Sequence, residues 1–214
     1  MNLVSMAIEY IREFFPGLTP AQLEQFETMM RLYPEWNERI NVISRKDIGN
    51  LEVQHILHSL AILKFIRFAP GTEVIDIGTG GGFPGLPLAA AMPDVHFHLI
   101  DRIGKKLRVA EEVAKAAGIE NVTFQHGDLG ECRRKFDFAV SRAVMPQPDL
   151  MRIASRVIAD NPQRNALPNG LITLKGGDLH GEIRPIATAT EIVDIHKWLP
   201  LPFFDTKKIV YTSK

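Results

Sequence analysis

The sequence predicts an α/β protein with a doubly wound, mostly parallel sheet of seven strands and an N-terminal helical extension. Two observations support this fold class. Up to about residue 68 apolar side chains recur at helical spacing, whereas from Glu73 onward short β-branched runs alternate with helical ones. A glycine-rich turn joins the first of these runs to the helix after it. We therefore divide the chain into a helical extension, 1–68, packed on an α/β domain, 69–214.

The extension is expected to contain three helices. The first has an apolar stripe at Val4, Ala7, Ile8, Ile11 and Phe15. Thr19 is a suitable N-cap and Pro20 a suitable first residue of the second helix, which Pro34 is expected to kink or split. The third helix is expected from about residue 51 to 68.

The α/β part contains seven strand-like runs. Five of them lie at 73–77, 95–100, 121–126, 136–141 and 170–175. The helices between them are expected near 84–92, 104–117 and 147–159. The last two runs, within "EIVDIHKWLP" and "KKIVYTSK", are expected to form an antiparallel pair at one edge of the sheet.

Composition limits the classes of function. The 214 residues are 45% apolar, which suffices for one α/β domain and an extension. Basic and acidic residues number 25 each, so a nucleic-acid partner would require locally clustered cations. Cys132 is the only cysteine, which excludes an internal disulfide. With no signal-peptide pattern and no long apolar run, we expect a cytoplasmic protein without membrane contact.

The stretch "VIDIGTGGGFPGLPLAAAM" indicates a ligand site. Gly80, Gly82 and Gly85 match the GxGxxG pattern, in which backbone N–H groups often hold a pyrophosphate. Asp76 ends the first strand and argues against a phosphate, because its carboxylate would repel one. It suits an ammonium and a sulfonium, and S-adenosylmethionine carries both. The alternative is a tight strand-to-helix turn that binds no ligand.

Asp101 ends the second strand and indicates a nucleoside. An acid at this position can accept hydrogen bonds from both ribose hydroxyls. That feature alone does not separate NAD from S-adenosylmethionine, but together with Asp76 it favours S-adenosylmethionine. The alternative role of Asp101 is the N-cap of the helix at 104–117.

Several motifs resemble those of one family. "DIGTGGGFPGLPLA", "LIDRIGKKLRVAEEV", "VSRAV" and "TLKGG", with "WNERINVIS" and "HILHSL" upstream, resemble the bacterial small-subunit ribosomal RNA guanine-N7 methyltransferases, formerly called glucose-inhibited division protein B. The similarity runs from about Trp36 to Gly176. His58 departs from it, since the family usually has Asp there, and so does "HGDLGE". The resemblance implies a Rossmann-like, S-adenosylmethionine-dependent enzyme that methylates N7 of a guanine in small-subunit (16S) ribosomal RNA.

The resemblance also implies roles for individual residues. Gly78 and Phe83 would contact the cofactor in the glycine loop, and the backbone of Leu129 and Gly130 would meet the adenine ring. Arg142 would face the methionine end of the cofactor or the target guanine, with a solvated surface arginine as the alternative. The expected cofactor-binding set is Asp76, Gly78, Gly80, Gly82, Phe83, Asp101, Leu129, Gly130 and Arg142.

Methylation of guanine N7 requires no general base, because N7 bears no proton. The enzyme must mainly align the nucleophile, the methyl carbon and the sulfur. We therefore expect no acid–base catalytic residue and no metal, and we regard Arg142 and Lys175, at predicted strand ends, as positioning residues. Cys132 is expected to be a bystander. His55 and His58 share a helical face, where packing or RNA contact is expected rather than a metal pair.

Small-subunit ribosomal RNA, or the assembling subunit, is the expected partner of a monomeric protein. The cations that would bind it are Lys105, Lys106, Arg108, Arg133, Arg134, Lys135, Arg142, Lys175, Lys207 and Lys208. For each run of cations a solvated face is the alternative. Two other functions stay open: an S-adenosylmethionine enzyme that acts on a small molecule or a protein, and a cofactor-binding module without catalysis.

Overall fold

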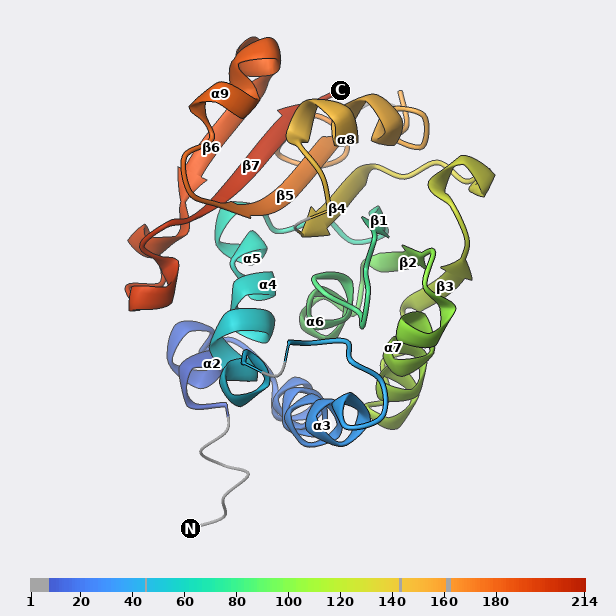
Figure 1. Ribbon diagram of the computed structural model, residues 1–214, viewed down its shortest axis with the longest axis vertical. Coiled ribbons are helices and arrows are strands. Elements are labelled where there is room, and N and C mark those ends of the chain that lie inside the picture. Colours follow the sequence, from blue (N-terminus) through green and yellow to red (C-terminus); the bar gives the residue numbers. More distant parts are fainter. Residues whose placement is uncertain (1–7, 45, 143, 161–162) are drawn as a thin grey trace.

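A seven-stranded sheet with helices on both faces forms the centre of the computed structural model, which describes residues 8–44, 46–142, 144–160 and 163–214 (Figure 1). The strands are β1 (Glu73–Ile77), β2 (His96–Asp101), β3 (Val122–His126), β4 (Phe138–Arg142), β5 (Gly170–Gly176), β6 (Thr190–Asp194) and β7 (Lys207–Ser213). Their order is β3-β2-β1-β4-β5-β7-β6. The first five are parallel, and β7 is antiparallel to β5 and β6. This confirms the predicted fold class and the antiparallel pair at the edge.

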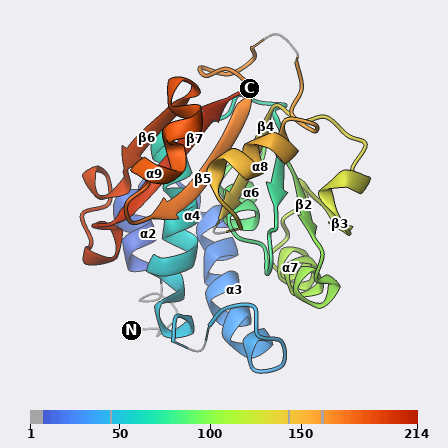
Figure 2. The ribbon, with the colours of Figure 1, turned by 45° about the horizontal axis from the view of Figure 1, so that its top comes forward.

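The side chains of each strand alternate between two apolar layers. One layer joins Val74, Leu99 and Val140 to the N-terminal helices and to α6 (Gly85–Ala91) and α7 (Gly104–Ala116). The other layer joins Ile75 and Ile77 to α8 (Gln147–Ala154). The short helix α9 (His180–Ile183) lies beside α8 (Figure 2). The carboxyl ends of β1, β2, β4 and β5 therefore lie between the two layers of helices.

The N-terminal helices pack on the same layer as α6 and α7. They are α2 (Glu9–Phe14), α3 (Pro20–Asn37), a π-helical turn (Glu52–Leu57), α4 (His58–Leu60) and α5 (Ile62–Phe65). Thr19 caps α3 through the N–H of Gln22, as the sequence predicts. Val4 and Ala7 of the predicted first helix lie outside the described residues, whereas Ile8 and Ile11 are buried. No helix in the described part of the chain has the length and apolarity needed to cross a bilayer.

Three predicted helices differ from the structure. Helix α3 continues through Pro34 to Asn37, so the predicted split at that proline is wrong. The single helix expected at 51–68 is divided into the π-helical turn, α4 and α5. Helix α8 ends at Ala154, five residues early, because Ile158 forms a parallel bridge with Phe136 and extended pairing replaces the helix there.

Candidate active site

The glycine turn after β1 is held by Asp76, which is fully buried. Its Oδ2 accepts hydrogen bonds from the Thr79 hydroxyl at 2.6 Å and from the Gly85 N–H at 2.7 Å. A Cβ at Gly85 would lie 2.8 Å from the same oxygen, so glycine allows α6 to begin at this position. Asp76 thus ties the two ends of the turn together, which explains an acid in front of a glycine run.

Asp76 lies under the turn and does not line either of the two cavities described below. Burial raises the pKa of its carboxyl to about 7, and the hydrogen bonds from Thr79 and Gly85 act in the opposite direction. Its Oδ1 has no hydrogen-bond partner within the described residues. A direct contact between Asp76 and a ligand cation stays a prediction, whereas its support of the turn is visible in the geometry.

The first cavity opens at the carboxyl ends of β1, β2 and β3 and has a volume of about 610 Å³. It brings together four residues of the predicted cofactor set: Gly78, Asp101, Leu129 and Gly130. Apolar side chains such as Ile103 and Met145 provide much of the remaining lining. A volume of this size and a mostly apolar wall are typical of small-molecule sites.

Asp101 supplies the carboxylate of the first cavity. Its Oδ2 accepts the N–H of Gly80 and its Oδ1 accepts the N–H of Ile103, both at 2.7 Å. The N-cap of α7 is Ile103, so the alternative of Asp101 as the N-cap residue is not realised, although it does satisfy a backbone donor in front of the helix. Each carboxylate oxygen has a second lone pair for a hydroxyl donor.

Gly78 approaches the segment that follows β4. Its φ is 70°, and a Cβ would lie 2.7 Å from Cγ2 of Val144. Both the backbone conformation and the close approach therefore require glycine. Val144 and Met145 line the first cavity at this point.

The second cavity, of about 600 Å³, lies at the carboxyl ends of β4 and β5 beside the N-terminal helices. Arg142 and Lys175, the two predicted positioning residues, both line it, together with His55 and His58. The chain runs from Arg142 in the second cavity to Val144 and Met145 in the first, so this short segment separates the two spaces.

Arg142 is held by three groups. One nitrogen donates to the backbone carbonyl of Gln54 at 3.3 Å and another to Nδ1 of His55 at 2.9 Å. The guanidinium also lies over the ring of Phe83, 5.1 Å from its centroid. Burial lowers the pKa of Arg142 to about 10, and burial followed by the charge of Arg142 lowers the pKa of His55 to about 3. At neutral pH a neutral imidazole therefore orients a charged arginine.

Phe83 and Gly82 line neither of the two cavities. Phe83 is buried and packs on Tyr33, with 4.7 Å between the ring centroids. The Tyr33 hydroxyl donates to the carbonyl of Gly81 at 2.7 Å, and the N–H of Gly82 donates to Thr79. Contact of Phe83 and Gly82 with a cofactor stays a prediction, since the structure shows them in contact with the N-terminal helices and the turn.

Lys175 is paired. Its Nζ lies 2.8 Å from Oε1 of Glu182 and donates to the carbonyl of Met145 at 2.9 Å. The same Glu182 oxygen accepts the N–H of Gln147 at 2.7 Å. The ion pair therefore fixes the segment between the two cavities on both sides, and RNA contact by Lys175 is not supported by this geometry.

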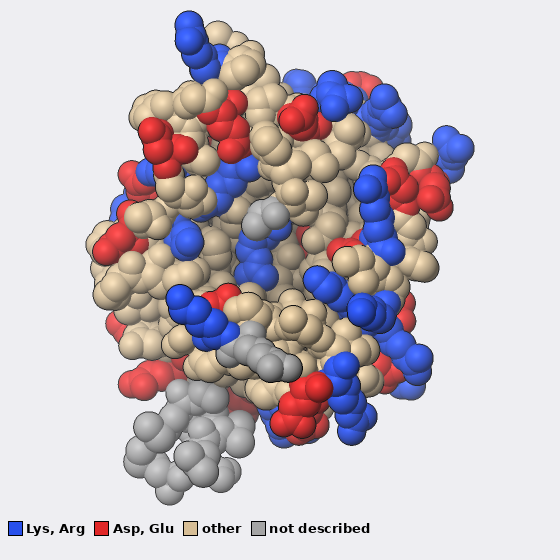
Figure 3. Space-filling model, viewed as in Figure 1, with Lys and Arg blue, Asp and Glu red and all other residues tan. Residues whose placement is uncertain are grey.

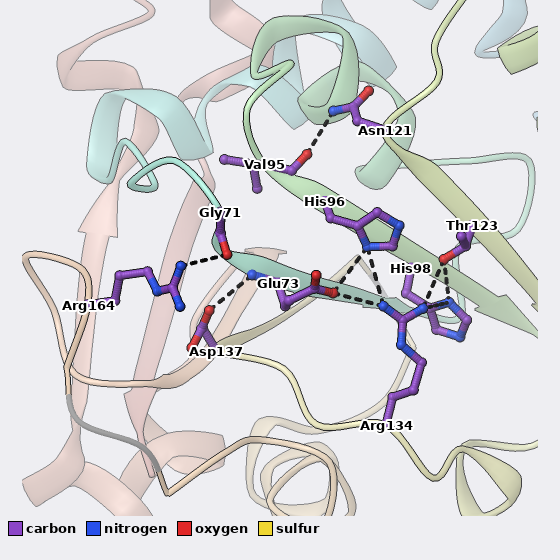
Figure 4. A network of polar contacts seen from close by, with 10 residues as sticks. All are labelled: Gly71, Glu73, Val95, His96, His98, Asn121, Thr123, Arg134, Asp137 and Arg164. Carbon is purple, nitrogen blue, oxygen red and sulfur yellow. Dashed lines mark hydrogen bonds and ion pairs between the residues drawn. The ribbon is translucent and has the colours of Figure 1, made fainter.

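The other predicted RNA-binding cations divide into two groups. Arg134 binds Glu73, His98 and Thr123 near the amino ends of the strands (Figure 4). Lys208 pairs with Asp194, and Lys135 donates to a backbone carbonyl. By contrast, five cations form no ion pair and no side-chain hydrogen bond with any described residue: Lys105, Lys106, Arg108, Arg133 and Lys207. Lys207 lines the second cavity, with its Nζ 4.9 Å from the ring centroid of Phe203. Figure 3 shows basic side chains inside and around the hollow in the middle of this face.

A family model described as rRNA small subunit methyltransferase G, or GidB, matches residues 22–193. The chain belongs to the GidB family. A relative of that name from Bacteroides thetaiotaomicron is 54% identical over 206 residues, which cover 96% of this chain and 100% of the relative. A relative with the same name from Phocaeicola vulgatus is 53% identical over 206 residues, 96% of this chain and 98% of the relative. The family resemblance stated from the motifs is thus confirmed.

A solved S-adenosylmethionine-dependent O-methyltransferase from Thermotoga maritima shares the fold. The TM-score is 0.57 at 16% identity, over 78% of this chain and 69% of that chain. This likeness confirms the predicted type of fold. As a member of the GidB family the chain is an S-adenosylmethionine-dependent methyltransferase, as predicted. Within the described residues no three His, Cys, Asp or Glu side chains form a metal-binding cluster.

Sequence reasoning missed the segment at Val144 and Met145 and the residue Glu182. None of them belongs to a polar motif, and their positions depend on how β5 and α9 pack. The sequence did contain one indication of this segment: "VMPQP" comes directly after a predicted strand, and ligand sites of α/β proteins form at such strand ends.

Proposed function

We propose that this protein transfers a methyl group to N7 of a guanine in small-subunit ribosomal RNA, either free or in the assembling subunit. The observation that carries the proposal is the arrangement of two cavities on either side of Val144 and Met145. In the first cavity the carboxylate of Asp101 and the apolar wall suit an adenosine, and the second cavity contains Arg142. The relatives' name, ribosomal RNA small subunit methyltransferase, supports RNA as the substrate. We place the enzyme in the cytoplasm as a monomer.

The residues of the first cavity fit S-adenosylmethionine. Asp101 has lone pairs for the ribose hydroxyls, and Leu129 and Gly130 offer backbone groups beside an apolar wall for the adenine. At Gly78 a side chain would collide with Val144, so glycine keeps this space open. When bound, this cofactor supplies a methyl group on a sulfonium. Asp76 supports the turn from below.

The second cavity then orients the base. N7 has a free lone pair, so the residues need only hold it in line with the methyl group and exclude water. Arg142 can donate to an oxygen of the base, because its hydrogen bonds to Gln54 and His55 leave other N–H groups available. His55 is neutral and accepts from Arg142, so it sets the orientation of the guanidinium and does not act as an acid.

The test is labelled methyl transfer from S-adenosylmethionine to small-subunit RNA of a strain that lacks the gene. Protein and metabolite extracts of that strain form parallel arms. We expect label in the RNA arm, at one nucleotide that is cleaved chemically as N7-methylguanosine and located by primer extension. Label in a protein, in a metabolite, on a pyrimidine carbon or on an exocyclic amine would refute the proposal.

A further inference from the structure

His58 lines the second cavity without a partner for one of its ring nitrogens. The side chain is 5% exposed, and Nε2 has no hydrogen-bond partner within the described residues. The rings of Phe203 and Phe204 stand edge-on to the imidazole, with centroids 5.4 Å and 5.8 Å away. Nε2 itself has almost no accessible surface, although the residue lines the cavity. Buried polar atoms are rarely left unpaired, so this nitrogen lacks the partner that a ligand in the cavity could supply once the covering side chain moves.

The free nitrogen is a hydrogen-bond acceptor. Burial, and then the charge of Arg142, lowers the pKa of His58 well below its usual value, so the ring is neutral. A hydrogen bond to the backbone of Gln54 acts in the opposite direction. We infer that Nδ1, the other ring nitrogen, makes this contact and carries the proton, since Nε2 has no partner. Nε2 is left with a lone pair and no donor.

We propose that Nε2 of His58 accepts a hydrogen bond from N1–H of the target guanine while Arg142 donates to the adjacent O6. This inference rests on the proposed function. N7, O6 and N1 follow one another around the edge of guanine. Arg142 ends β4, next to β1 and the first cavity, whereas His58 lies farther away against Phe203 and Phe204, which precede β7.

This order of residues matches the order of atoms on the base. A guanine with N7 toward the first cavity presents O6 to Arg142 and N1–H to His58. Because Nε2 is covered in this structure, the proposal requires the ring of Phe203, which also lines the cavity, to turn aside when the base enters. Adenine has an amino group in place of O6 and a lone pair at N1, so it would set donor against donor and acceptor against acceptor. His58 and Arg142 together therefore select guanine.

The experiment uses synthetic RNAs that span the mapped nucleotide, with guanosine, inosine or adenosine at that position. Inosine keeps O6 and N1–H and lacks only the 2-amino group. The parent enzyme should methylate guanosine and inosine RNA with similar kcat/KM and adenosine RNA at least about 100-fold less efficiently. An inosine RNA as poor as the adenosine RNA would overturn the proposal.

His58→Leu should lower kcat/KM for guanosine RNA at least about tenfold and leave adenosine RNA unchanged. His58→Gln, which keeps an acceptor, should restore part of the preference. The matched control is His180→Leu, an exposed histidine of α9, which should behave as the parent. An unchanged ratio of guanosine to adenosine in His58→Leu would overturn the inference while guanine N7 methylation by the parent still stands.

A measurement on the parent chain covers the case in which the His58 variants do not fold. Nitrogen NMR of His58 should show a proton on Nδ1 in the free protein and a shift of Nε2 when guanosine RNA binds, with no such shift for adenosine RNA. A proton on Nε2, or equal shifts for both RNAs, would overturn the inference. Failure of the parent to methylate any guanine N7 would overturn the proposed function itself.

Discussion

Asp76 is the last residue but one of β1 and Asp101 is the last residue of the neighbouring parallel strand β2, yet the two carboxylates make different contacts. Both positions were identified from the sequence, because strand ends are marked by glycines and helix starts. Their partners were not, because the direction of a carboxylate depends on which backbone N–H groups the tertiary fold brings within reach. Asp101 faces the first cavity, and Asp76 faces the N-terminus of α6. The same residue type near two neighbouring strand ends thus lines a cavity in one case and ties a turn together in the other.

Replacement of Asp76 by Asn should change how stability depends on pH. The folded-state pKa of Asp76, about 7, lies above the unfolded value of about 3.9. The folded chain therefore holds the proton more tightly, and Asp76 makes folding less favourable as the pH rises from about 4 to about 7. Relative to the parent, Asp76→Asn should gain a few kcal/mol of unfolding free energy across that range and no more above it, as measured by urea denaturation.

Asn keeps an oxygen that can accept from Thr79 and Gly85, so the turn should persist in this variant. Asp94→Asn, at an exposed position, is the control and should show no comparable trend. A difference between Asp76→Asn and the parent that is constant from pH 4 to pH 8 would contradict the assignment.

At the scale of elements, β5 and α9 together position the segment between the two cavities. Lys175 extends from the end of β5 and Glu182 from α9, and they bind Met145 and Gln147 on either side of that segment. The sequence predicted the end of β5 to within one residue and a short helix in "DLHGEIRPIATA", where α9 lies. It did not predict that Glu182 of this helix pairs with Lys175, because that contact depends on how α9 packs. The ion pair between Lys175 and Glu182 links β5 to α9, and together the two residues support the wall of the first cavity.

Lys175→Met should raise the KM for S-adenosylmethionine at least about fivefold, because the wall at Val144 and Met145 loses a support. The dissociation constant for RNA should stay within about twofold of the parent value, and so should its salt dependence. Lys208→Met is the matched control, since Lys208 lies opposite Lys175 in the β5–β7 register but pairs with Asp194. A loss of RNA affinity with an unchanged KM would show that Lys175 contacts RNA after all.

Helix α7 begins directly after the first cavity with three cations that form no ion pair with described residues. The double change Lys105→Gln and Arg108→Gln should weaken RNA binding and reduce the slope of log affinity against log salt by roughly 1.4 to 1.8. The same change at Lys115, at the other end of α7, is the control and should leave the slope unchanged. Binding is measured by fluorescence anisotropy at several salt concentrations. An unaltered slope in the double variant would place the RNA elsewhere.

At the scale of the whole molecule, the helical extension and the sheet share one apolar layer. Fully buried Phe26, Met29 and Tyr33 of α3 belong to the same cluster as strand residues Val74 and Phe97. The alternation of strand and helix patterns predicted the parallel sheet well, because β1, β2, β4 and β5 are buried on both faces and read as short apolar runs. It did not predict how the 1–68 segment packs, since helix docking depends on the shapes of both surfaces.

We therefore expect residues 1–68 and 69–214 to unfold together in one transition. Trp36 reports on α3 and Trp198 on the segment before β7, and these are the two tryptophans of the chain. Urea unfolding of Trp36→Phe and Trp198→Phe, each followed by the remaining tryptophan and by circular dichroism, should give coincident curves within each variant. Midpoints that differ by more than about 0.5 M between the two probes would show that the extension unfolds independently.

The segment at Val144 and Met145 also bears on inhibitor chemistry. A compound that fills only the first cavity meets carboxylates, arginines and an apolar wall, and its selectivity would rest on that lining alone. An extension past Val144 enters a space with a charged arginine and an acceptor nitrogen on His58. A two-part molecule, an adenosine joined to a ring with neighbouring carbonyl and N–H groups, would draw its selectivity from that second part, and its linker would have to match the thickness of a single stretch of backbone.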